Sequence, residues 1–397
     1  MSTSLNIKIG GPAHNGEAAL SEDTTTRFMA RLRELMLGPS EADRLGRKRF
    51  IAPRRGFGFF GKPADEAAPR AYVAPTTPGF TRMFQRDKLT LGLFFAIDNY
   101  DGDMPDMSRQ LELAKRADEL GYAALWTRDV PLRDPSFGDV GQIYDPWVWL
   151  GLITGHTRDI ALATGSIVFP LNHPITLAKA AASVDNLSGG RLVLGIASGD
   201  RAIEFPAFGL EIEQRGDVFR ESLAYFNRLL EERFPHIQSP LGEMKGADLI
   251  PKPLGNRIPI GITGHCRQDP DWIAANCDAW IMYSNSPSTQ AIVMQTWRDA
   301  VEKSGHTDFK PFVQPLGIDL SEDPNETQSP LRSGFRLGRN LLIELLGELQ
   351  KVGVNHIALN FKRGQRPAAE VMEEIAQEVL PHFPSHEATP AESGKAS

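Results

Sequence analysis

The side chains best suited to chemistry in this sequence stand in short polar segments, each of which follows an apolar run. Small residues and main-chain amides near the start of a helix bind anions such as phosphate, and an arginine there adds a charge-assisted contact. If the apolar runs are parallel strands, the segments share one edge and predict a ligand site. The segments are 127–134 (TRDVPLRD), 170–174 (PLNHP), 198–201 (SGDR) and 264–268 (GHCRQ).

Arg128 and Asp129 are the first charged residues after the second apolar run. A guanidinium stays cationic at any working pH, so Arg128 can stabilise an anion or bind an acidic substrate but cannot act as a general base. Asp129 can act as the base if burial raises its pKa. The structural alternative is an ion pair, Arg128 with Asp129 or Arg133 with Asp134, that only shapes the loop.

From residue 88 onward, apolar runs typical of buried parallel strands alternate with amphipathic helical patterns. About eight such units predict a closed (β/α)8 barrel of the TIM type, whose chemistry sits in the loops after the strands. The rival is an open doubly wound sheet. It needs fewer units and a cofactor-binding turn after its first strand, where this sequence has 98–102 (DNYDG) instead.

The expected strands are 89–97, 122–127, 160–170, 191–197, 258–263, 279–283, 312–320 and 356–361. The expected helices are 107–120, 145–154, 176–187, 215–232, 270–276, 289–303, 337–351 and 368–380. Each helix follows one strand, which is the order that a parallel barrel requires.

Residues 1–85 differ from this body in charge and composition. Residues 1–88 hold 15 Lys and Arg against 9 Asp and Glu, whereas the whole chain has a net charge of −7. We expect residues 1–85 to form a basic, Pro- and Gly-rich, partly disordered arm with one short helix around Phe28 and Met36, and 386–397 to form a disordered tail. The match of 56–61 (GFGFFG) to a nucleotide-binding loop lacks the strand before it and the helix after it.

Composition excludes several classes of protein. The negative charge disfavours nucleic acid as a partner, and no run approaches the ~20 apolar residues of a membrane span. Cys266 and Cys277 are too few for a disulfide scaffold. With no secretory signal visible, we expect a cytoplasmic protein without a membrane segment, a nucleic-acid partner or a metal site.

Four blocks of the sequence resemble bacterial-luciferase-like flavin monooxygenases. Residues 163–200 (ATGSIVFPLNHPITLAKAAASVDNLSGGRLVLGIASGD) resemble the central signature of that superfamily. Residues 125–147, 249–264 and 353–383 resemble a subgroup usually described as luciferase-type oxidoreductases. The similarity runs in order over about residues 78–383, and it implies a (β/α)8 barrel that holds reduced FMN at the carboxyl-end rim.

The resemblance also implies roles for particular residues. The flavin ring is expected on Gly165–Ser166, where the family often has a non-prolyl cis peptide, and the phosphate between the loops after the fourth and fifth strands. Luciferase itself has an arginine in place of Ser198 and a serine in place of Cys266. It has a catalytic histidine where this chain has Arg128–Asp129, so the resemblance implies that Arg128 and Asp129 are the catalytic residues. The expected cofactor-binding residues are Gly165, Ser166, Ser198, Gly199, Asp200, Arg201, Thr263, Gly264, His265 and Cys266.

The activity that the resemblance implies is a two-component monooxygenase. Such an enzyme receives reduced FMN from a separate flavin reductase and uses O₂ to oxidise a small organic substrate. Two alternatives stay open: a deazaflavin-dependent hydride-transfer enzyme on the same barrel, and a non-catalytic flavin-binding relative, which the missing histidine and arginine would suit. A homodimer through the second and third helices is expected by family analogy.

Overall fold

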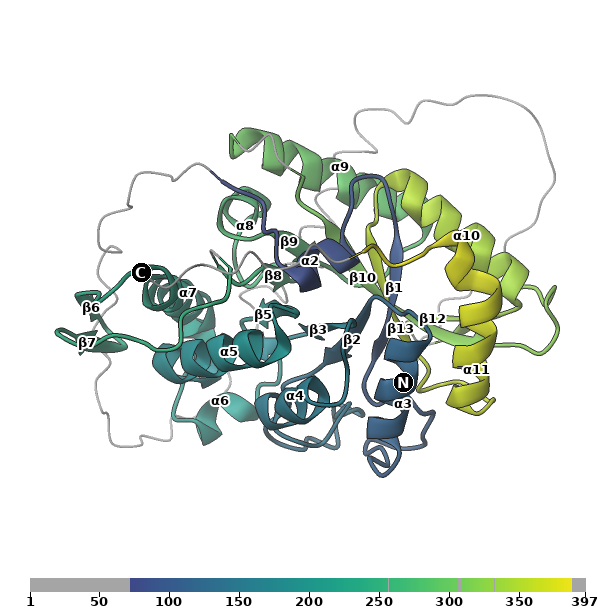
Figure 1. The fold of residues 1–397 in the computed structure, drawn as a ribbon, viewed down its shortest axis with the longest axis horizontal. Helices are drawn as coiled ribbons and strands as arrows, with labels where there is room; N and C mark the ends of the chain where they lie inside the picture. The colour runs from purple at the N-terminus through teal and green to yellow at the C-terminus, as the bar shows by residue number, and fades with distance from the viewer. Residues whose placement is uncertain (1–71, 256, 306–308, 332, 388–397) are drawn as a thin grey trace, which may run out of the picture. The chain divides into compact units, whose positions relative to one another are not determined.

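Eight parallel strands pair in a closed ring in the computed structural model, which describes residues 72–387 apart from 256, 306–308 and 332 (Figure 1). Thr90 of the first strand lies in register with His356 of the last, and this pairing closes the ring. The predicted (β/α)8 barrel is confirmed, and the open sheet is wrong. In ring order, the strands are β1 (Thr90–Phe94), β2 (Ala124–Thr127), β3 (Ala161–Thr164), β5 (Leu192–Ala197), β8 (Ile260–Thr263), β9 (Ala279–Ile281), β10 (Phe312–Leu320) and β13 (His356–Asn360).

The strands form where the apolar runs predict them, because a strand covered on both faces buries every side chain. All residues of β1, β2 and β3 are buried. The expected strand 160–170 is divided: β3 is followed by the Gly165–Ser166 peptide, which is cis, then by β4 (Ile167–Val168) and a 3₁₀ turn (Phe169–Leu171). β4 pairs with β5 in parallel, as β3 does, but the register shifts by one residue, since Ala163 lies opposite Val193 and Ile167 lies opposite Ile196.

One helix follows each strand of the ring and covers the outside of the barrel (Figure 1). Local signals set their ends: Asp145 accepts hydrogen bonds from two amides at the start of the second helix, and Gly189 ends the third with a φ of 71°. The helices are α3 (Gln110–Glu119), α4 (Pro146–Thr154), α5 (Pro174–Ser188), α7 (Arg215–Glu231), α8 (Pro270–Asn276), α9 (Pro287–Lys303), α10 (Arg339–Val352) and α11 (Ala368–Glu374).

Several short elements were not expected from the sequence. A four-residue helix, α6, begins at Glu204 and ends at Ala207, directly after β5. Two hairpins project from the loops. The last strand of the second hairpin also pairs with β10 in parallel. These hairpins are β6 (Ile237–Ser239) with β7 (Gly242–Met244), and β11 (Ser329–Leu331) with β12 (Gly334–Leu337).

A short helix, α2 (Pro78–Met83), covers the amino ends of the strands, although the sequence assigned it to the arm. Phe80 and Met83 are buried against alanine side chains of the barrel interior. A Cβ on Gly79 would lie 2.3 Å from the carbonyl oxygen of Arg191, so only glycine allows this approach. The helix expected near Phe28, the glycine motif at 56–61 and the tail at 388–397 lie outside the described residues.

A chain of hydrogen bonds runs through the barrel interior. The Trp126 indole Nε1–H donates to His356 Nε2 at 2.9 Å, and because an indole nitrogen can only donate, His356 carries its proton on Nδ1. That proton is donated to Thr90 Oγ1 at 2.7 Å, and the Thr90 hydroxyl donates to the carbonyl oxygen of Met83. Burial lowers the pKa of His356 to about 3, so the imidazole stays neutral.

Replacing His356 by leucine is expected to lower the free energy of unfolding by about 2 kcal/mol, because it leaves the Trp126 indole and the Thr90 hydroxyl without this partner. Urea unfolding measures the change. Trp126→Phe in the same background removes the orphaned donor and should recover part of the loss, and the exposed His236→Leu serves as the control. Equal unfolding midpoints for H356L and wild type would contradict this interpretation.

Candidate active site

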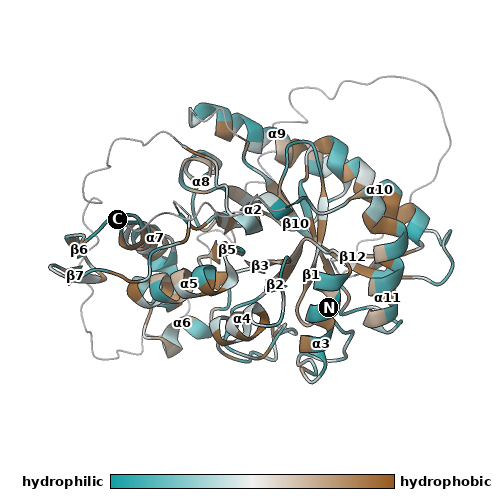
Figure 2. Cartoon of the chain, viewed as in Figure 1, coloured by the Kyte–Doolittle hydropathy of each residue, from teal (hydrophilic) through white to brown (hydrophobic). Residues whose placement is uncertain are grey.

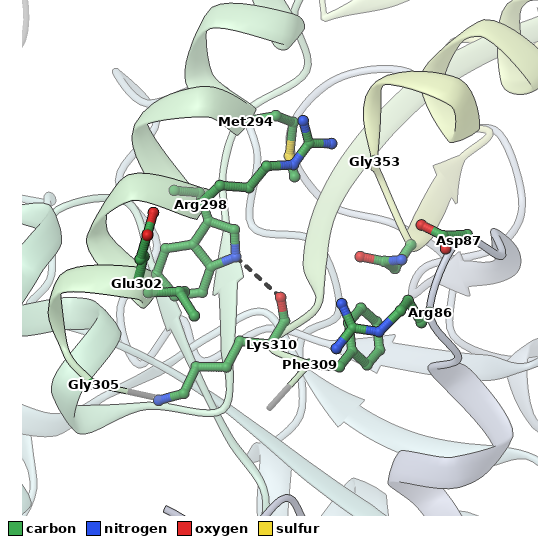
Figure 3. Close-up of a pocket in the computed structure, with 12 residues that line it drawn as sticks. Arg86, Asp87, Met294, Arg298, Glu302, Gly305, Phe309, Lys310 and Gly353 are labelled. Atoms are coloured by element: carbon green, nitrogen blue, oxygen red, sulfur yellow. Dashed lines mark hydrogen bonds between the residues drawn. The ribbon is translucent and has the colours of Figure 1, made fainter. Parts of the chain in front are cut away.

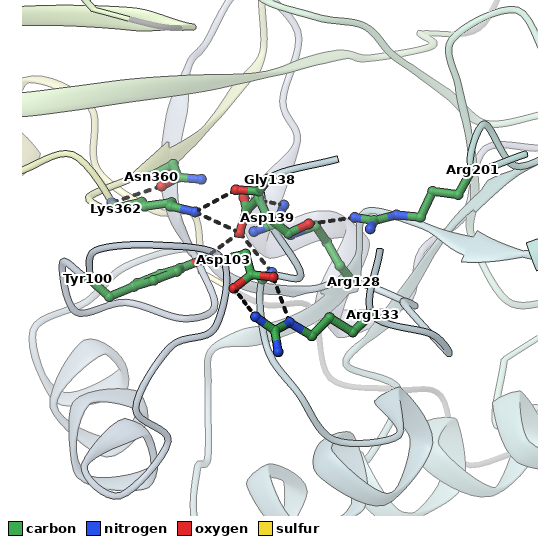
Figure 4. Close-up of polar contacts among 10 residues, drawn as sticks. Tyr100, Asp103, Arg128, Arg133, Gly138, Asp139, Arg201, Asn360 and Lys362 are labelled. Carbon is green, nitrogen blue, oxygen red and sulfur yellow. Dashed lines mark hydrogen bonds and ion pairs between the residues drawn. The ribbon is translucent and has the colours of Figure 1, made fainter. Parts of the chain in front are cut away.

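The loops after three strands, β1, β2 and β13, meet at the carboxylate of Asp139, which lies in the loop after β2 (Figure 4). This carboxylate accepts from Tyr100 Oη at 2.7 Å, from Arg128 Nη1 at 3.0 Å and from the Gly141 amide at 2.9 Å. It also lies 3.1 Å from the ammonium of Lys362, which follows β13. Burial alone would raise the pKa of Asp139, but the Arg128 guanidinium and these hydrogen bonds outweigh burial and hold it well below its usual range.

The ion pairs in this loop differ from those considered for the sequence. Arg128 pairs with Asp139 instead of its neighbour Asp129. Arg133 pairs with Asp103, with two contacts of 2.7 and 2.9 Å, and not with Asp134. The alternative that paired adjacent residues is therefore wrong, because the loop folds back and brings more distant carboxylates to the arginines.

Asp129 is left in an environment without a cationic partner among the described residues. Its Oδ2 accepts from the Val168 amide of β4 at 3.1 Å, and the Asn172 side chain also binds it. Burial raises the pKa of Asp129 to about 6, and the nearby charge of Asp145 adds to the shift. This is the condition that a general base at this position requires, and its role stays a prediction.

Arg201 lies over the same loop. It is 6% exposed, its guanidinium stacks on the ring of Phe137 at 3.9 Å, and its Nη2 donates to the carbonyl oxygen of Asp139 at 2.6 Å. Its Nη1 is buried and has no hydrogen-bond partner in the described part of the chain. Arg201 therefore joins the loops after β5 and β2.

The loops after β5 and β8 bring together several of the expected cofactor-binding residues. The hydroxyl groups of Ser166 and Thr263 share a hydrogen bond, and Ser198 contacts the thiol of Cys266. Gly199 and Gly264 have φ values of 83° and 63°. The left-handed backbone turns both loops sharply, and nothing lies within 4 Å of a Cβ built on Gly264.

Three expected residues here have environments that the sequence did not reveal. Burial raises the pKa of Cys266 to about 12, so it stays a thiol. His265 stacks edge-on against Trp280 at 5.5 Å, its Nε2 is buried without a partner in the described residues, and burial lowers its pKa. Asp200 influences the pKa of Tyr283, so that tyrosine lies near the same loop.

Two further arginines stand beside this group. Arg215 begins α7, and burial and the neighbouring charge of Arg267 lower its pKa. Gln268 joins the loop after β8 to the start of α7 by donating to the carbonyl oxygens of Gly216 and Cys266, both at 3.0 Å. Arg267 lies in the segment 264–268, where an arginine is expected to add a charge-assisted contact to an anion. Arg215 was missed, although its place at the first residue of an expected helix was a signal for an anion site.

Gly165 lies directly against aromatic rings inside the barrel mouth. A Cβ built on it would be 3.0 Å from the Phe94 ring and 3.2 Å from that of Trp126. Both rings are buried, and the Arg128 guanidinium lies 5.8 Å from the centre of the Phe94 ring. The two rings already fill the space where a Cβ would stand, so Gly165 packs directly on an aromatic floor that has no room for a larger residue.

A cavity of about 460 Å³ lies at the opposite end of the barrel, before β1, β10 and β13 (Figure 3). Three of its lining side chains are engaged in hydrogen bonds. Trp297 Nε1 donates to the carbonyl oxygen of Lys310, Lys310 Nζ donates to the Ala274 and Cys277 carbonyls, and Arg298 donates to that of Val352. The described residues hold no group of three or more His, Cys, Asp or Glu able to bind a metal. None of their helices is long and apolar enough to cross a membrane.

Comparison with known proteins decides the family. A family model for luciferase-like monooxygenases matches residues 89–383. The chain belongs to this family. The barrel, the match and the resemblance noted in the sequence agree on this family.

The chain spans about a third to a half of the length of the curated relatives that it matches. A 4-hydroxyprotoasukamycin monooxygenase of Streptomyces nodosus subsp. asukaensis is 30% identical over 146 residues, 36% of this chain and 38% of that protein. The oxygenase component of a flavin-dependent trigonelline monooxygenase from Acinetobacter baylyi is 28% identical over 167 residues, 42% of each chain.

Solved structures share the fold. The monooxygenase RslO1 of Streptomyces bottropensis superposes with a TM-score of 0.63 at 18% identity, covering 74% of this chain and 99% of that one. An F420-dependent secondary alcohol dehydrogenase gives a TM-score of 0.61 at 16% identity, with coverage of 75% and 99%. The same barrel therefore occurs in proteins whose names specify different chemistry.

Replacing Asp139 by asparagine is expected to destabilise the protein by about 2 kcal/mol at neutral pH, because Arg128 and Lys362 lose their shared carboxylate. Since the pKa of Asp139 is depressed in the folded protein, its stabilisation is present above about pH 4 and is lost as the pH falls below that. Urea unfolding at several pH values should therefore show the difference between D139N and wild type shrinking in acid.

Asp103→Asn is the control, since it breaks only the exposed pair with Arg133. If D139N were destabilised by the same amount at neutral and at acid pH, the conclusion that ionised Asp139 stabilises the fold would be contradicted.

Proposed function

We propose that this chain is the oxygenase component of a two-component monooxygenase, which uses reduced FMN and O₂ to oxidise a small organic substrate. The observation that carries the proposal is one arrangement at the barrel mouth. Gly165, which has no side chain, lies on the aromatic rings of the barrel interior. Nearby, the loops after β5 and β8 turn sharply and bring main-chain amides and arginines together. A flat ring with an anionic tail has the matching shape and charge.

The residues present fit FMN. The isoalloxazine would rest against the Gly165–Ser166 peptide, which the Phe94 and Trp126 rings support by packing directly on Gly165. The phosphate would be held by the amides of 198–201 and 264–267, together with Arg215 and Arg267. The buried His265 Nε2, which has no partner among the described residues, is a further donor or acceptor for the cofactor.

The chain's own residues have separate parts in the chemistry. When bound, reduced FMN supplies the electrons for O₂ activation. Phe94 and Trp126 keep water away from one side of the site, Arg128 stabilises anionic oxygen, and Asp129 gives or takes a proton. A separate reductase is proposed to supply the reduced flavin, since the A. baylyi relative is named as an oxygenase component.

The structural neighbour that uses F420 supports a second candidate, deazaflavin-dependent hydride transfer. The phosphate of a deazaflavin cofactor would bind to the same arginines, Arg215 and Arg267. A third candidate, flavin binding without catalysis, has support in the Arg128–Asp139 pair, which occupies the place of luciferase's histidine.

Anaerobic titration with reduced FMN, followed by mixing with O₂, tests the proposal. We expect saturable FMN binding and flavin-dependent O₂ consumption, which substrate couples to product formation. Binding of F420 with substrate turnover in the absence of O₂ would favour hydride transfer, and binding of FMN with no O₂ reactivity would favour the non-catalytic candidate.

Riboflavin, which is FMN without its phosphate, is the control ligand for the proposed phosphate contact. Arg267→Ala is expected to weaken FMN binding about tenfold, the worth of one charge-assisted contact, and to leave riboflavin binding unchanged. Arg298→Ala, at the opposite end of the barrel, should change neither affinity. An R267A protein that binds both flavins as wild type does would exclude this phosphate site.

We also propose that a second copy of the chain covers α4. This helix contains no charged residue, and its inner side chains Trp149, Leu150 and Ile153 are buried in the barrel layer. Its outer side chains Val148 and Leu152 are 72% and 43% exposed, on a helix with apolar residues on both faces (Figure 2). A helix that is apolar all round is normally covered.

Val148→Asp is expected to convert the dimer to a monomer, because it places a charge in the buried interface. Light scattering after size-exclusion chromatography measures the mass. Val73→Asp, which is also exposed but lies away from α4 in the sequence, should leave the mass unchanged. A wild-type monomer at micromolar concentration would contradict the dimer.

A further inference from the structure

Part of the loop after β2 reaches across the mouth of the barrel. We call residues 137–142 (FGDVGQ) the cover segment. The carbonyl oxygen of Gly138 accepts from Lys362 Nζ, in the loop after β13, at 3.3 Å. The carbonyl oxygen of Asp139 accepts from Arg201 Nη2, in the loop after β5, at 2.6 Å (Figure 4). Because β13 and β5 stand on opposite sides of β2 in the ring, the cover segment extends over the strand ends on both sides of β2.

The cover segment also holds Arg128 against the aromatic floor. The Asp139 carboxylate pairs with Arg128 Nη1 at 3.0 Å. Gly141 lies directly on the same guanidinium, since a Cβ built there would be 2.4 Å from Arg128 Nε. With a φ of 67°, this position requires glycine both for its backbone and for the close approach. The guanidinium lies 5.8 Å from the centre of the Phe94 ring, so it is placed between the cover segment and the floor of the site.

Arg201 binds the cover segment in two ways. Besides its hydrogen bond to the Asp139 carbonyl oxygen, its guanidinium is stacked on the Phe137 ring, 3.9 Å from the ring centre. Arg201 is 6% exposed and Phe137 is 40% exposed, so the ring lies between the guanidinium and the solvent. A cation–π contact and a charge-assisted hydrogen bond are both stronger when water is excluded from them. These two contacts therefore hold the middle of the segment to the loop after β5.

The same contacts are unsuited to binding the phosphate of FMN, the role that the resemblance implies for Arg201. Arg201 is buried, whereas Arg267 is exposed and Arg215 is half-buried. Its Nη1 is buried as well, and its charge already favours the ionised forms of two nearby carboxyl groups, Glu204 and Asp134. A phosphate at Arg201 would have to displace groups that already surround the guanidinium.

We propose that Arg201 is a positioning residue that holds the cover segment across the barrel mouth and, through Asp139, holds Arg128 over the flavin site. Asp139 joins the two arginines, because its carbonyl oxygen binds Arg201 and its carboxylate binds Arg128. The cover segment then separates the bound flavin from water, which the reaction of reduced flavin with O₂ requires. That the covered place holds a flavin rests on the proposed function, whereas the contacts of Arg201 need no cofactor.

Hydrogen exchange of the full chain without flavin, followed by mass spectrometry, tests the contact itself. The Val140 and Gly141 amides are hydrogen-bonded in the cover segment. In Arg201→Ala we expect peptides with these amides to exchange about tenfold faster, because opening no longer breaks a charge-assisted hydrogen bond. Phe137→Leu removes only the stacked ring and should give a smaller increase. Peptides from α5 should exchange as in wild type, because the barrel itself stays folded.

Arg298→Ala is the matched control. Arg298, like Arg201, donates to a main-chain carbonyl oxygen, at 2.8 Å, but it does so at the opposite end of the barrel. R298A should leave the exchange of the cover segment unchanged. Wild-type exchange of this segment in both R201A and F137L would overturn the proposal. If R201A does not fold, F137L decides the result by itself.

The binding of FMN and riboflavin distinguishes positioning from phosphate binding. We expect R201A to change the affinities for both flavins by the same factor, and iodide to quench the fluorescence of bound riboflavin more strongly than in wild type. Arg201→Lys can still donate to the Asp139 carbonyl oxygen and should restore part of the protection from iodide. A loss of FMN affinity of about tenfold with unchanged riboflavin binding would identify a phosphate ligand and overturn the proposal.

The two proposals can fail separately. If the wild-type protein binds neither flavin, the proposed function fails, and the exchange experiment still decides whether Arg201 holds the cover segment. If flavin binds and reacts with O₂ but the exchange of R201A equals that of wild type, the proposed function stands and the role of Arg201 is wrong.

Discussion

Closure of the parallel ring is the constraint on which the site depends. β1 and β13 pair across the seam, and Thr90 and His356, 266 residues apart in the chain, are hydrogen-bonded there. Because all eight strands of the ring run the same way, every loop after a strand reaches one rim. The polar segments of the sequence converge for this reason alone, and without closure they would lie along an open edge.

Different charged groups lie on the two sides of the rim of the barrel. In the loop after β2, Asp139 forms ion pairs with Arg128 and Lys362. Asp129 therefore has no cationic partner among the described residues. Beside α7, by contrast, burial and the nearby charge of Arg267 lower the pKa of Arg215. One side is therefore suited to holding a proton and the other to binding an anion, and the interactions are strong because burial removes the screening of water.

The barrel interior links the rim to the opposite end. Trp126 contributes to the floor under Gly165, and its indole is held through His356 and Thr90 by the end of α2. Both ends of this hydrogen-bond chain are buried, and an indole nitrogen leaves a single arrangement for the protons. The helix that covers the amino end of the barrel thereby helps to position the floor of the candidate site.

The sequence by itself determined the alternation of strands and helices, since period and burial leave a local record in residue type. The helix over 270–276 and the strand over 312–320 were predicted with their observed bounds. It also placed the polar segments after strands, and the long ordered resemblance indicated the family that the comparison established.

Only the tertiary structure decided which groups meet. Arg128 pairs with Asp139 and not with its neighbour, Glu204 becomes buried without a full set of partners, and the expected strand at 160–170 divides into β3 and β4. None of these has a periodic signature, because each depends on how a loop folds back over the rim. Burial and pairing are properties of the assembled barrel, and they set the proton affinities on which any chemistry here relies.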